Sequence, residues 1–367
     1  REFASAAGRW CHLDGLEFAP KLVSCCDLNA TNRAWFESNV ASISQSTDDY
    51  RAVLENKDVE AIYCAVPHKL HEEMYCDIIR SGKHLLGEKP FGMDKAQNDA
   101  IAACIRDNPK THVSCSSEFP FFPGVLMISE WLREERFGEI FEVEAGFWHS
   151  SDLNPDKAIN WKRMINVNGE YGCMGDLGMH VCHFPFRYGF TPTEVNARLV
   201  NIIRERPDGK GGKVPCETWD NAHLDCRTKT KDGASIPLSF TIKRIAPGHA
   251  NTWFVRINGT KMSAEFSTKN PKQVRWMNYE PGGQQAWNEM DTPHKSAYKS
   301  ITGGIFEFGF SDSLLQMWAA FCDELVNGRE SMAQPFYCAT PEEAAKTHEL
   351  FTAALQSHKE NRCVSLA

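Results

Sequence analysis

HLLGEKPFG, residues 84–92, is an apolar run that ends abruptly in two opposite charges and a proline. Glu88 and Lys89 follow a segment typical of a buried strand, and Pro90 fixes the direction of the chain after them. Around this stretch, apolar runs at 22–28, 60–66, 84–89 and 112–119 alternate with amphipathic runs at 31–39, 47–56, 71–82 and 94–108. Alternating strands and helices predict an α/β fold with a parallel, doubly wound sheet.

The start of each expected helix is indicated by a short polar residue that can accept hydrogen bonds from the first free backbone N–H groups. Asp94 precedes the run at 94–108, and Thr47 or Asp48 precedes the one at 47–56. We therefore expect Asp94, and either Thr47 or Asp48, to cap these two helices.

After about residue 118 the pattern changes to a series of strands with little helix between them. The expected strands are 139–150, 194–205, 221–228, 235–245, 252–259 and 261–268. Glycine-rich turns between them favour antiparallel pairing, so we expect an α+β domain with a large, mostly antiparallel open sheet. Two helices, 311–328 and 341–361, are expected to close the chain.

Bulk properties limit the classes of function. A chain of 367 residues is long for one core, so two domains are expected. Its net charge of -8 excludes a nucleic-acid or anionic-membrane partner, which needs clustered cations, and no apolar run is long enough to span a membrane. The 14 cysteines are scattered without a CxxC pair, which is typical of a reducing cytoplasm. A small-molecule partner is therefore expected.

A ligand of a doubly wound sheet binds at the carboxyl ends of the strands, where an acidic residue often accepts from the adenosine ribose. Asp27 ends the run 22–28 and fits that place. The glycine fingerprint should lie about 20 residues earlier, at or before Arg1, and no GxGxxG occurs there. Either upstream residues precede Arg1 in a longer protein, or the phosphate cradle was lost. A parallel sheet without its central strand would expose two edges, so we expect the first explanation.

Two segments carry a resemblance to a known family. The run AIYCAVPHKLHEEMYCDIIRSGKHLLGEKPFG (61–92) resembles the Gfo/Idh/MocA family of NAD(P)-dependent sugar and polyol dehydrogenases, whose members read approximately (I/V)xxTPxxxH, a helix, and GKHVxxEKP. GCMGDLGMHVCHF (172–184) is similar to the family segment GGGxxxDxGxHxxD, and 341–366 to its last helix and strand. The residues that match the first pattern are Pro67, His71, Gly82, Lys83, His84, Glu88, Lys89 and Pro90.

The resemblance implies two domains and a nicotinamide cofactor. Residues 1–118 would form a Rossmann dinucleotide-binding domain, and 119–367 a substrate-binding domain that also makes a homodimer or homotetramer. The Lys89–Pro90 bond is often cis in the family. NAD is expected over NADP, because the carboxylate of Asp27 accepts from a ribose hydroxyl but repels a phosphate. The cofactor-binding candidates are Asp27, Pro67, His68, His71, Glu88 and Lys89.

Lys89, Asp176 and His180 are the catalytic candidates. Oxidation of a secondary alcohol needs a base for the O–H proton, and histidine titrates in the right range. On a helix, Asp176 and His180 would share one face, where Asp176 could hold the substrate hydroxyl or the imidazole. Asp176, His180 and His183 could also hold a metal ion, but a fourth ligand is not evident, so no metal is expected.

The chain departs from the family pattern at His183, where the family often has Asp, and at Val66 and His68, where it has Thr and Asn. These changes affect the expected polar contacts rather than the fold. The substrate-binding candidates are Trp148, Trp161, Arg163 and His183, with His294 and Tyr298 of the polar loop 279–300 as weaker ones. Each tryptophan could instead serve packing alone.

The predicted function is a cytoplasmic oxidoreductase that transfers a hydride between nicotinamide and a secondary alcohol or ketone of a sugar, sugar derivative or cyclitol. Two alternatives stay open. Some family members use transient oxidation by bound NAD to cleave a glycosidic bond, and a few are non-catalytic sugar or nucleotide sensors. The presence of Lys89 together with Asp176 and His180 argues against the sensor, which needs no base beside a hydroxyl.

Overall fold

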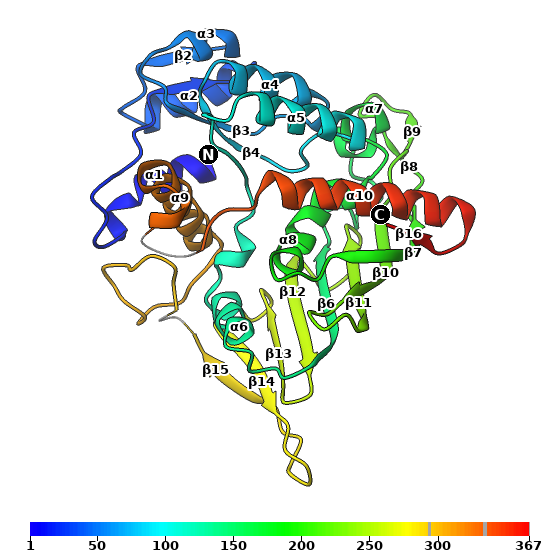
Figure 1. Cartoon of the computed structure of the whole chain (residues 1–367). Coiled ribbons are helices and arrows are strands. Elements are labelled where there is room, and N and C mark those ends of the chain that lie inside the picture. The colour runs from blue at the N-terminus through cyan, green and yellow to red at the C-terminus, as the bar shows by residue number, and fades with distance from the viewer. Residues whose placement is uncertain (293–294, 333–335, 367) are drawn as a thin grey trace.

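The computed structural model describes residues 1–292, 295–332 and 336–366. The N-terminal third lies above a large sheet, and the long helix α10 (Pro341–Glu360) crosses between the two (Figure 1). A capping box opens this helix: Glu343 N donates to Thr340 Oγ1, and Thr340 N donates to Glu343 Oε2.

The N-terminal third follows the predicted alternation of strand and helix, and every strand pair in it is parallel. One strand, β2, is three residues long and was not predicted. The helix cap at Asp94 is confirmed, whereas the cap predicted at Thr47 or Asp48 is wrong: the side chain of Asp49 accepts from Arg51 N. The elements are α1 (Glu2–Gly8), β1 (Ser24–Cys26), α2 (Ala30–Asn39), β2 (Gln45–Thr47), α3 (Tyr50–Glu55), β3 (Ala61–Cys64), α4 (His71–Arg80), β4 (His84–Gly87), α5 (Lys95–Asp107) and β5 (Val113–Cys115).

The parallel strands fall into two separate sheets. β1 pairs with β2, and β3 pairs with β4, which pairs with β5. Among the described residues no ladder joins β1 to β3. Helix α1 packs beside this break, where the ring of Phe3 stacks on Tyr63 with the centroids 3.6 Å apart. The carboxyl ends of β1, β3 and β4 are the part of this arrangement on which the site depends.

The second part is built on a nine-stranded sheet in the order β15-β14-β13-β12-β6-β11-β10-β7-β16. All pairs are antiparallel except β6 with β11, so the predicted mostly antiparallel sheet is confirmed. Its strands are β6 (Ile140–His149), β7 (Pro192–Val200), β10 (Asn221–Lys229), β11 (Ser235–Lys243), β12 (Asn251–Gly259), β13 (Met262–Ser267), β14 (Gln273–Asn278), β15 (Asn288–Asp291) and β16 (Val364–Ser365). β14 and β15 were not predicted, and β15 lies within the predicted loop 279–300.

One face of this sheet carries the main core, because apolar residues alternate along its strands. In β10, Ala222, Leu224 and Cys226 are buried and the residues between them are exposed. Helices α8 (Met179–Arg187) and α10 cover that face, and α6 (Pro123–Arg133) contacts β13 and β14. Within the residues that the structure describes, no helix covers the opposite face.

Helix α9 (Phe310–Asn327) returns to the N-terminal third and packs against α1. Leu314 and Met317 of α9 share one buried cluster with Phe3, Leu86 and further residues. The division of the chain at residue 118 therefore stays a proposal, with α9 bridging the two parts.

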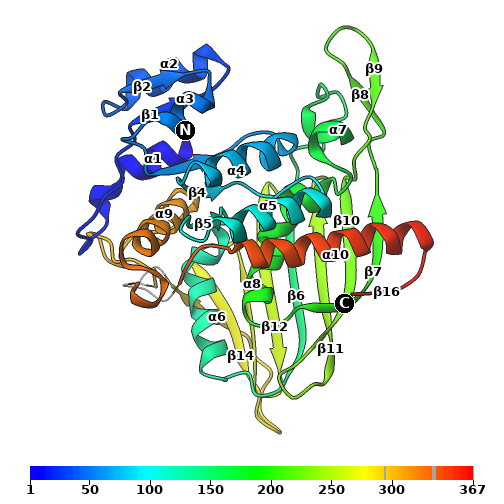
Figure 2. The same ribbon diagram turned by 45° about the horizontal axis from the view of Figure 1, so that its top comes forward.

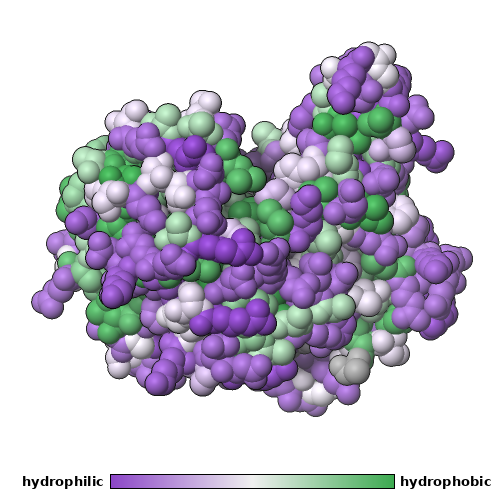
Figure 3. Space-filling view, turned by 90° about the horizontal axis from the view of Figure 1, so that it is seen from above, coloured by the Kyte–Doolittle hydropathy of each residue, from purple (hydrophilic) through white to green (hydrophobic). Residues whose placement is uncertain are grey.

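A short arm stands out from the second part in a tilted view (Figure 2). It is made of the paired strands β8 (Glu205–Pro207) and β9 (Lys213–Pro215), with α7 (Ile165–Asn168) nearby. Seen from above, the surface is notched between this arm and the N-terminal third, and hydrophilic side chains dominate the view (Figure 3). Within the described residues, no helix is long and apolar enough to cross a membrane.

Candidate active site

Lys89 reaches from the end of β4 into the second part of the molecule. The strand ends at Gly87, and the Lys89–Pro90 peptide bond is cis, as the resemblance implied. The Nζ of Lys89 lies 3.0 Å from Asp176 Oδ1 and also donates to the main-chain oxygen of Asp176. This contact joins the edge of the parallel strands to the segment before α8.

Asp176 lies on a single π-helical turn, Met174–Gly178, that leads into α8. A regular α-helix was expected here, and the π-helical turn was not predicted. Lys162 Nζ donates to Asp176 Oδ1 over 2.9 Å, and Arg244 Nη1 donates to Oδ2. Burial alone would raise the pKa of Asp176, but Lys89, Arg244 and Lys162 hold it well below its ordinary value. The carboxylate is therefore ionised at neutral pH.

His180 follows in the first turn of α8. Its Nδ1 lies 3.1 Å from Ser117 Oγ, and its ring meets Phe119 and Phe147 edge to face. Trp253 Nε1 donates to the main-chain oxygen of His180 over 2.7 Å, which anchors the turn. Burial, and then the charge of Lys89, lower the pKa of His180 well below its ordinary value. The imidazole is therefore neutral at neutral pH.

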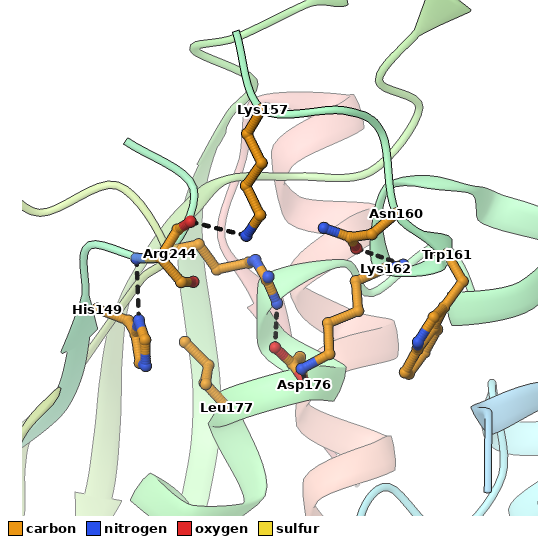
Figure 4. Close-up of a pocket in the computed structure, with 9 residues that line it drawn as sticks. His149, Lys157, Asn160, Trp161, Lys162, Asp176, Leu177 and Arg244 are labelled. Carbon is orange, nitrogen blue, oxygen red and sulfur yellow. Dashed lines mark hydrogen bonds and ion pairs between the residues drawn. The ribbon is translucent and has the colours of Figure 1, made fainter. Parts of the chain in front are cut away.

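A cavity of about 260 Å³ opens beside Asp176. Lys157, Lys162 and Arg244 point their cationic ends toward its centre, and Asp176 lies at its floor (Figure 4). Arg244 also donates through Nε to Asp152 Oδ2 over 2.9 Å, so it bridges two buried carboxylates. The other residues that line the cavity are His149, Ser151, Asn160, Trp161 and Leu177.

The sequence did not predict four residues that line the cavity or contact its charged groups: Ser117, Asp152, Lys157 and Arg244. Arg244 comes directly after β11 and contacts Asp176, 68 residues away. Ser117 comes shortly after β5 and contacts His180, 63 residues away. The only available signal was the position of each beside the end of an expected strand.

The cofactor-binding candidates fall into two groups. Asp27, Pro67, His68 and Glu88 lie after the carboxyl ends of β1, β3 and β4. His68 is buried, its Nδ1 lies 3.1 Å from the oxygen of Asn168, and burial lowers its pKa to about 3. His71 is also buried, but both of its ring nitrogens contact main-chain oxygens, those of Pro90 and Val66. It therefore ties two chain segments together.

The side chains at these strand ends are partly occupied by neighbours. Asp27 Oδ1 accepts from Asn29 N over 2.7 Å, and Glu88 Oε1 accepts from the Tyr63 hydroxyl over 2.7 Å. Each carboxylate keeps a second lone pair for another donor.

Of the substrate-binding candidates, only Trp161 lines the cavity. Trp148 donates from Nε1 to Thr241 Oγ1 over 2.8 Å on the sheet, and the fully buried Arg163 pairs with Asp220 at 2.5 Å. His183 pairs with Glu343 of α10. The structure thus does not bring these three to the cavity.

Only one of the two weaker candidates in the loop 279–300 lies among the described residues. Tyr298 is buried and donates to Asp323 Oδ2 over 2.8 Å, and His294 lies outside the described residues.

The spacing that suggested a metal site does not bring three ligands together. Asp176 turns to Lys89, Lys162 and Arg244, whereas His180 contacts Ser117 and His183 turns to α10. Over the described ranges there is no group of three or more His, Cys, Asp or Glu that could hold a metal ion.

Comparison with known proteins identifies the N-terminal third. Residues 6–116 match the family model GFO_IDH_MocA, described as "Oxidoreductase family, NAD-binding Rossmann fold". Among curated proteins, levoglucosan dehydrogenase from Pseudarthrobacter phenanthrenivorans is 25% identical over 243 residues, which are 63% of this chain and 61% of that protein. A dTDP-3,4-didehydro-2,6-dideoxy-alpha-D-glucose 3-reductase from Actinomadura kijaniata is 32% identical over 136 residues, 37% of this chain and 39% of that protein. The chain thus matches about three fifths or less of the length of these relatives.

Among solved structures, levoglucosan dehydrogenase in complex with NADH and L-sorbose superimposes with a TM-score of 0.86 at 19% identity, covering 100% of this chain and 95% of that one. An oxidoreductase domain protein from Kribbella flavida gives a TM-score of 0.85 at 19% identity, covering 100% and 94%. These likenesses confirm the fold over both parts of the molecule. The resemblance stated from the sequence is confirmed over residues 6–116, which match the Gfo/Idh/MocA family model, and the solved structures above share the two-part fold of the chain.

Proposed function

We propose that the protein is an NAD-dependent oxidoreductase that transfers a hydride between nicotinamide and a secondary alcohol or ketone of a sugar, sugar derivative or cyclitol. The observation that carries this proposal is the contact of Lys89 with Asp176 beside the neutral, buried His180, at the edge of a sugar-sized cavity. The similarity to a levoglucosan dehydrogenase and to a dTDP-sugar 3-reductase supports a carbohydrate substrate.

The residues divide the chemistry between them. Bound nicotinamide would accept the hydride that leaves the substrate carbon. The hydroxyl on that carbon must lose its proton at the same time, and His180, neutral in this environment, is the group that takes it. Lys89 donates to the reacting oxygen and stabilises the negative charge that develops there. Asp176 holds Lys89 in place through the 3.0 Å contact.

The residues at the strand ends fit the two ends of a dinucleotide. Asp27, after β1, suits a ribose hydroxyl and favours NAD over NADP, and His68, Glu88 and Lys89 lie toward the nicotinamide end. The pyrophosphate needs free backbone N–H groups at a glycine turn, and no GxGxxG occurs near the start of this sequence. The proposal therefore covers only the two ends of the dinucleotide, and assigns them to Asp27, His68, Glu88 and Lys89.

A cytoplasmic homo-oligomer completes the proposed setting. All 14 cysteines are free, which suits a reducing compartment. Exposed residues such as Arg198, His223 and Asp225 line the helix-free face of the nine-stranded sheet, and this face is the surface that we assign to a dimer or tetramer contact.

The test is NADH formation by the purified protein over a panel of sugars, cyclitols and glycosides. We expect turnover with one substrate class, and its loss in Lys89→Met and His180→Gln. Lys95→Met is the matched control, because Lys95 pairs with Asp99 on α5 and does not line the cavity. Turnover that survives both site variants would overturn the assignment of these residues.

A second candidate function is an NAD-dependent glycosidase. Glycosyl hydrolase family 109 protein 1 from Phocaeicola vulgatus is 29% identical over 180 residues, 46% of this chain and 36% of that protein. In this case the panel would release free aglycone from a glycoside without net NADH. Tight NAD binding with neither product would instead favour the sensor.

A further inference from the structure

We propose that the cavity beside Asp176 accepts a monosaccharide that carries an anionic group, a carboxylate or a phosphate, and that Arg244, Lys157 and Lys162 recognise that group. The inference rests on the proposed function, because it names the class of substrate that the same cavity takes.

The first observation is an excess of positive charge. Three cations line the cavity, Lys157, Lys162 and Arg244, and within the described part of the chain their carboxylate partners are Asp152 and Asp176. Each carboxylate offsets one cation, so one positive charge remains. His149 adds none, since burial and the charge of Arg244 lower its pKa and leave it neutral.

No other acid among the residues that the structure describes lines the cavity. Glu118 lies near Lys89, but it is not part of the cavity wall, and burial raises its pKa to about 7. The oxidised nicotinamide of the proposed reaction would bring a further positive charge to this region. A neutral sugar would leave that excess uncompensated, whereas an anionic one would offset it.

The second observation is a buried donor that points into the cavity without an acceptor. Arg244 is 4% exposed and lines the cavity. Its Nε donates to Asp152 and its Nη1 to Asp176. Among the described residues, none accepts from its Nη2. This N–H group at the cavity can donate to a bound ligand, and a charged oxygen is the strongest acceptor for it.

The third observation is the position of the two lysines. Lys157 Nζ is held 2.9 Å from the oxygen of Ser151, and Lys162 Nζ lies 2.9 Å from Asp176 Oδ1. Lys157 descends from above the cavity toward Arg244, and Lys162 reaches from the side to Asp176 (Figure 4). Three cationic ends thus converge from two sides on a space that one anionic group would fill.

The size of the cavity limits the rest of the ligand. Its volume of about 260 Å³ lies near the lower end of the range for small-molecule pockets. Trp161 adds a ring to the wall, which suits the apolar face of one sugar ring. A single ring with one anionic substituent therefore fits better than a longer saccharide.

The test compares sugars of the same configuration that differ only in charge. NADH formation is measured with D-glucose, D-glucuronate and D-glucose 6-phosphate, and with the corresponding galactose and mannose compounds. We expect at least one acid or phosphate to exceed its neutral partner in kcat/KM by about 10- to 100-fold, the value of one charge-assisted hydrogen bond. Comparing the uronate with the sugar phosphate shows whether the cavity prefers a carboxylate or a phosphate.

Variants locate the effect. Arg244 also holds Asp176, so its removal would disturb the site itself, and Lys157→Met is the sharper change. This variant should reduce the ratio of kcat/KM for the anionic and neutral partners about tenfold. Lys95→Met, the remote control, should leave the ratio unchanged. An unchanged ratio in Lys157→Met, or neutral sugars that equal their anionic partners in every series, would overturn the inference.

Thermal unfolding with each sugar separates this inference from the proposed function. If no sugar is oxidised but an acid or phosphate raises Tm and its neutral partner does not, the anion site stands and the dehydrogenase proposal fails. If neutral sugars are oxidised and no anionic one binds or reacts, the dehydrogenase proposal stands and this inference fails. If none of the compounds reacts or raises Tm, both fail.

Discussion

Two buried ionic clusters lie at opposite ends of the segment 174–187, and they are built from the same kinds of groups. At one end Asp176 contacts Lys89, Lys162 and Arg244, and at the other Glu343 contacts His183 and Arg187. Burial would raise the pKa of both carboxylates, yet their cationic partners hold both pKa values below the ordinary range.

The clusters differ in whether their arginine keeps a hydrogen-bond donor that no protein group accepts. Arg187 uses Nε on Glu343, Nη1 on the oxygen of Tyr337 and Nη2 on that of Cys338, so its guanidinium is fully engaged by the chain. Arg244 has an unmatched Nη2 within the described residues and faces a cavity. Paired charge alone therefore does not mark a functional site. We take a donor that has no protein acceptor and faces a cavity as the mark of a functional cluster, called open below. A cluster whose donors are all accepted by the chain, called closed below, stabilises the fold.

The largest expected difference is in catalysis. Lys89→Met should lower kcat about 10²- to 10⁴-fold, the usual contribution of a positioned proton-transfer or polar group. Its effect on the free energy of unfolding should stay within about 1 kcal/mol, because Asp176 keeps Lys162 and Arg244 as partners. Steady-state kinetics and urea unfolding on one preparation measure both. A variant that unfolds easily but turns over normally would reverse the roles of the clusters.

The closed cluster should show the opposite behaviour. Glu343→Gln leaves Arg187 buried with less compensation and weakens the capping box of α10, so the free energy of unfolding should fall by about 3–5 kcal/mol. kcat of the folded enzyme should change less than about twofold. Urea unfolding with activity measured before the transition tests this.

The matched control for this variant is Glu342→Gln, on the same turn of α10 but exposed. Its free energy of unfolding should change by less than about 0.5 kcal/mol. Equal destabilisation by the two variants would assign the effect to the charge of the helix end rather than to the cluster.

The stabilising effect of Glu343 should also depend on pH. His183, Arg187 and the N–H of Thr340 hold the pKa of Glu343 at about 2, below its ordinary 4.5. A carboxyl with a lowered pKa adds stability that is present above its unfolded pKa and is lost as pH falls toward the folded one. Between pH 5 and pH 3 the advantage of the native protein over Glu343→Gln should shrink by about 2 kcal/mol. A constant difference over that window would contradict the pairing.

The sequence predicted the fold better than it predicted the partners of the charged residues. The strand and helix rhythm, the mostly antiparallel sheet and the family resemblance are confirmed, because hydrophobic periodicity and fixed motifs are local properties. Whether a charged residue lies in an open or a closed cluster depends on groups far along the chain. His183 and Arg163 were expected at the substrate, but Glu343 and Asp220 bind them 160 and 57 residues later.

Local geometry set a second limit. The spacing of Asp176 and His180 suggested a regular α-helix, and no local signal predicted the π-helical turn on which Asp176 lies. Arg244 and Asp152 carry no local motif, so only the folded chain brings them to the cavity.

The smallest expected difference concerns two tryptophans that the sequence treated alike. Trp161 lines the cavity, and its ring stands edge to face against His68 at 4.9 Å between centroids. Trp148 is fixed on the sheet by Thr241 and packs on Phe254 at 4.9 Å. Trp161→Leu should raise KM about fivefold, the value of one aromatic contact of roughly 1 kcal/mol, and Trp148→Leu should leave KM within about twofold. Equal effects on KM would show that the substrate also depends on Trp148. The difference between a side chain at the cavity and one packed on the sheet would then not hold for aromatic residues.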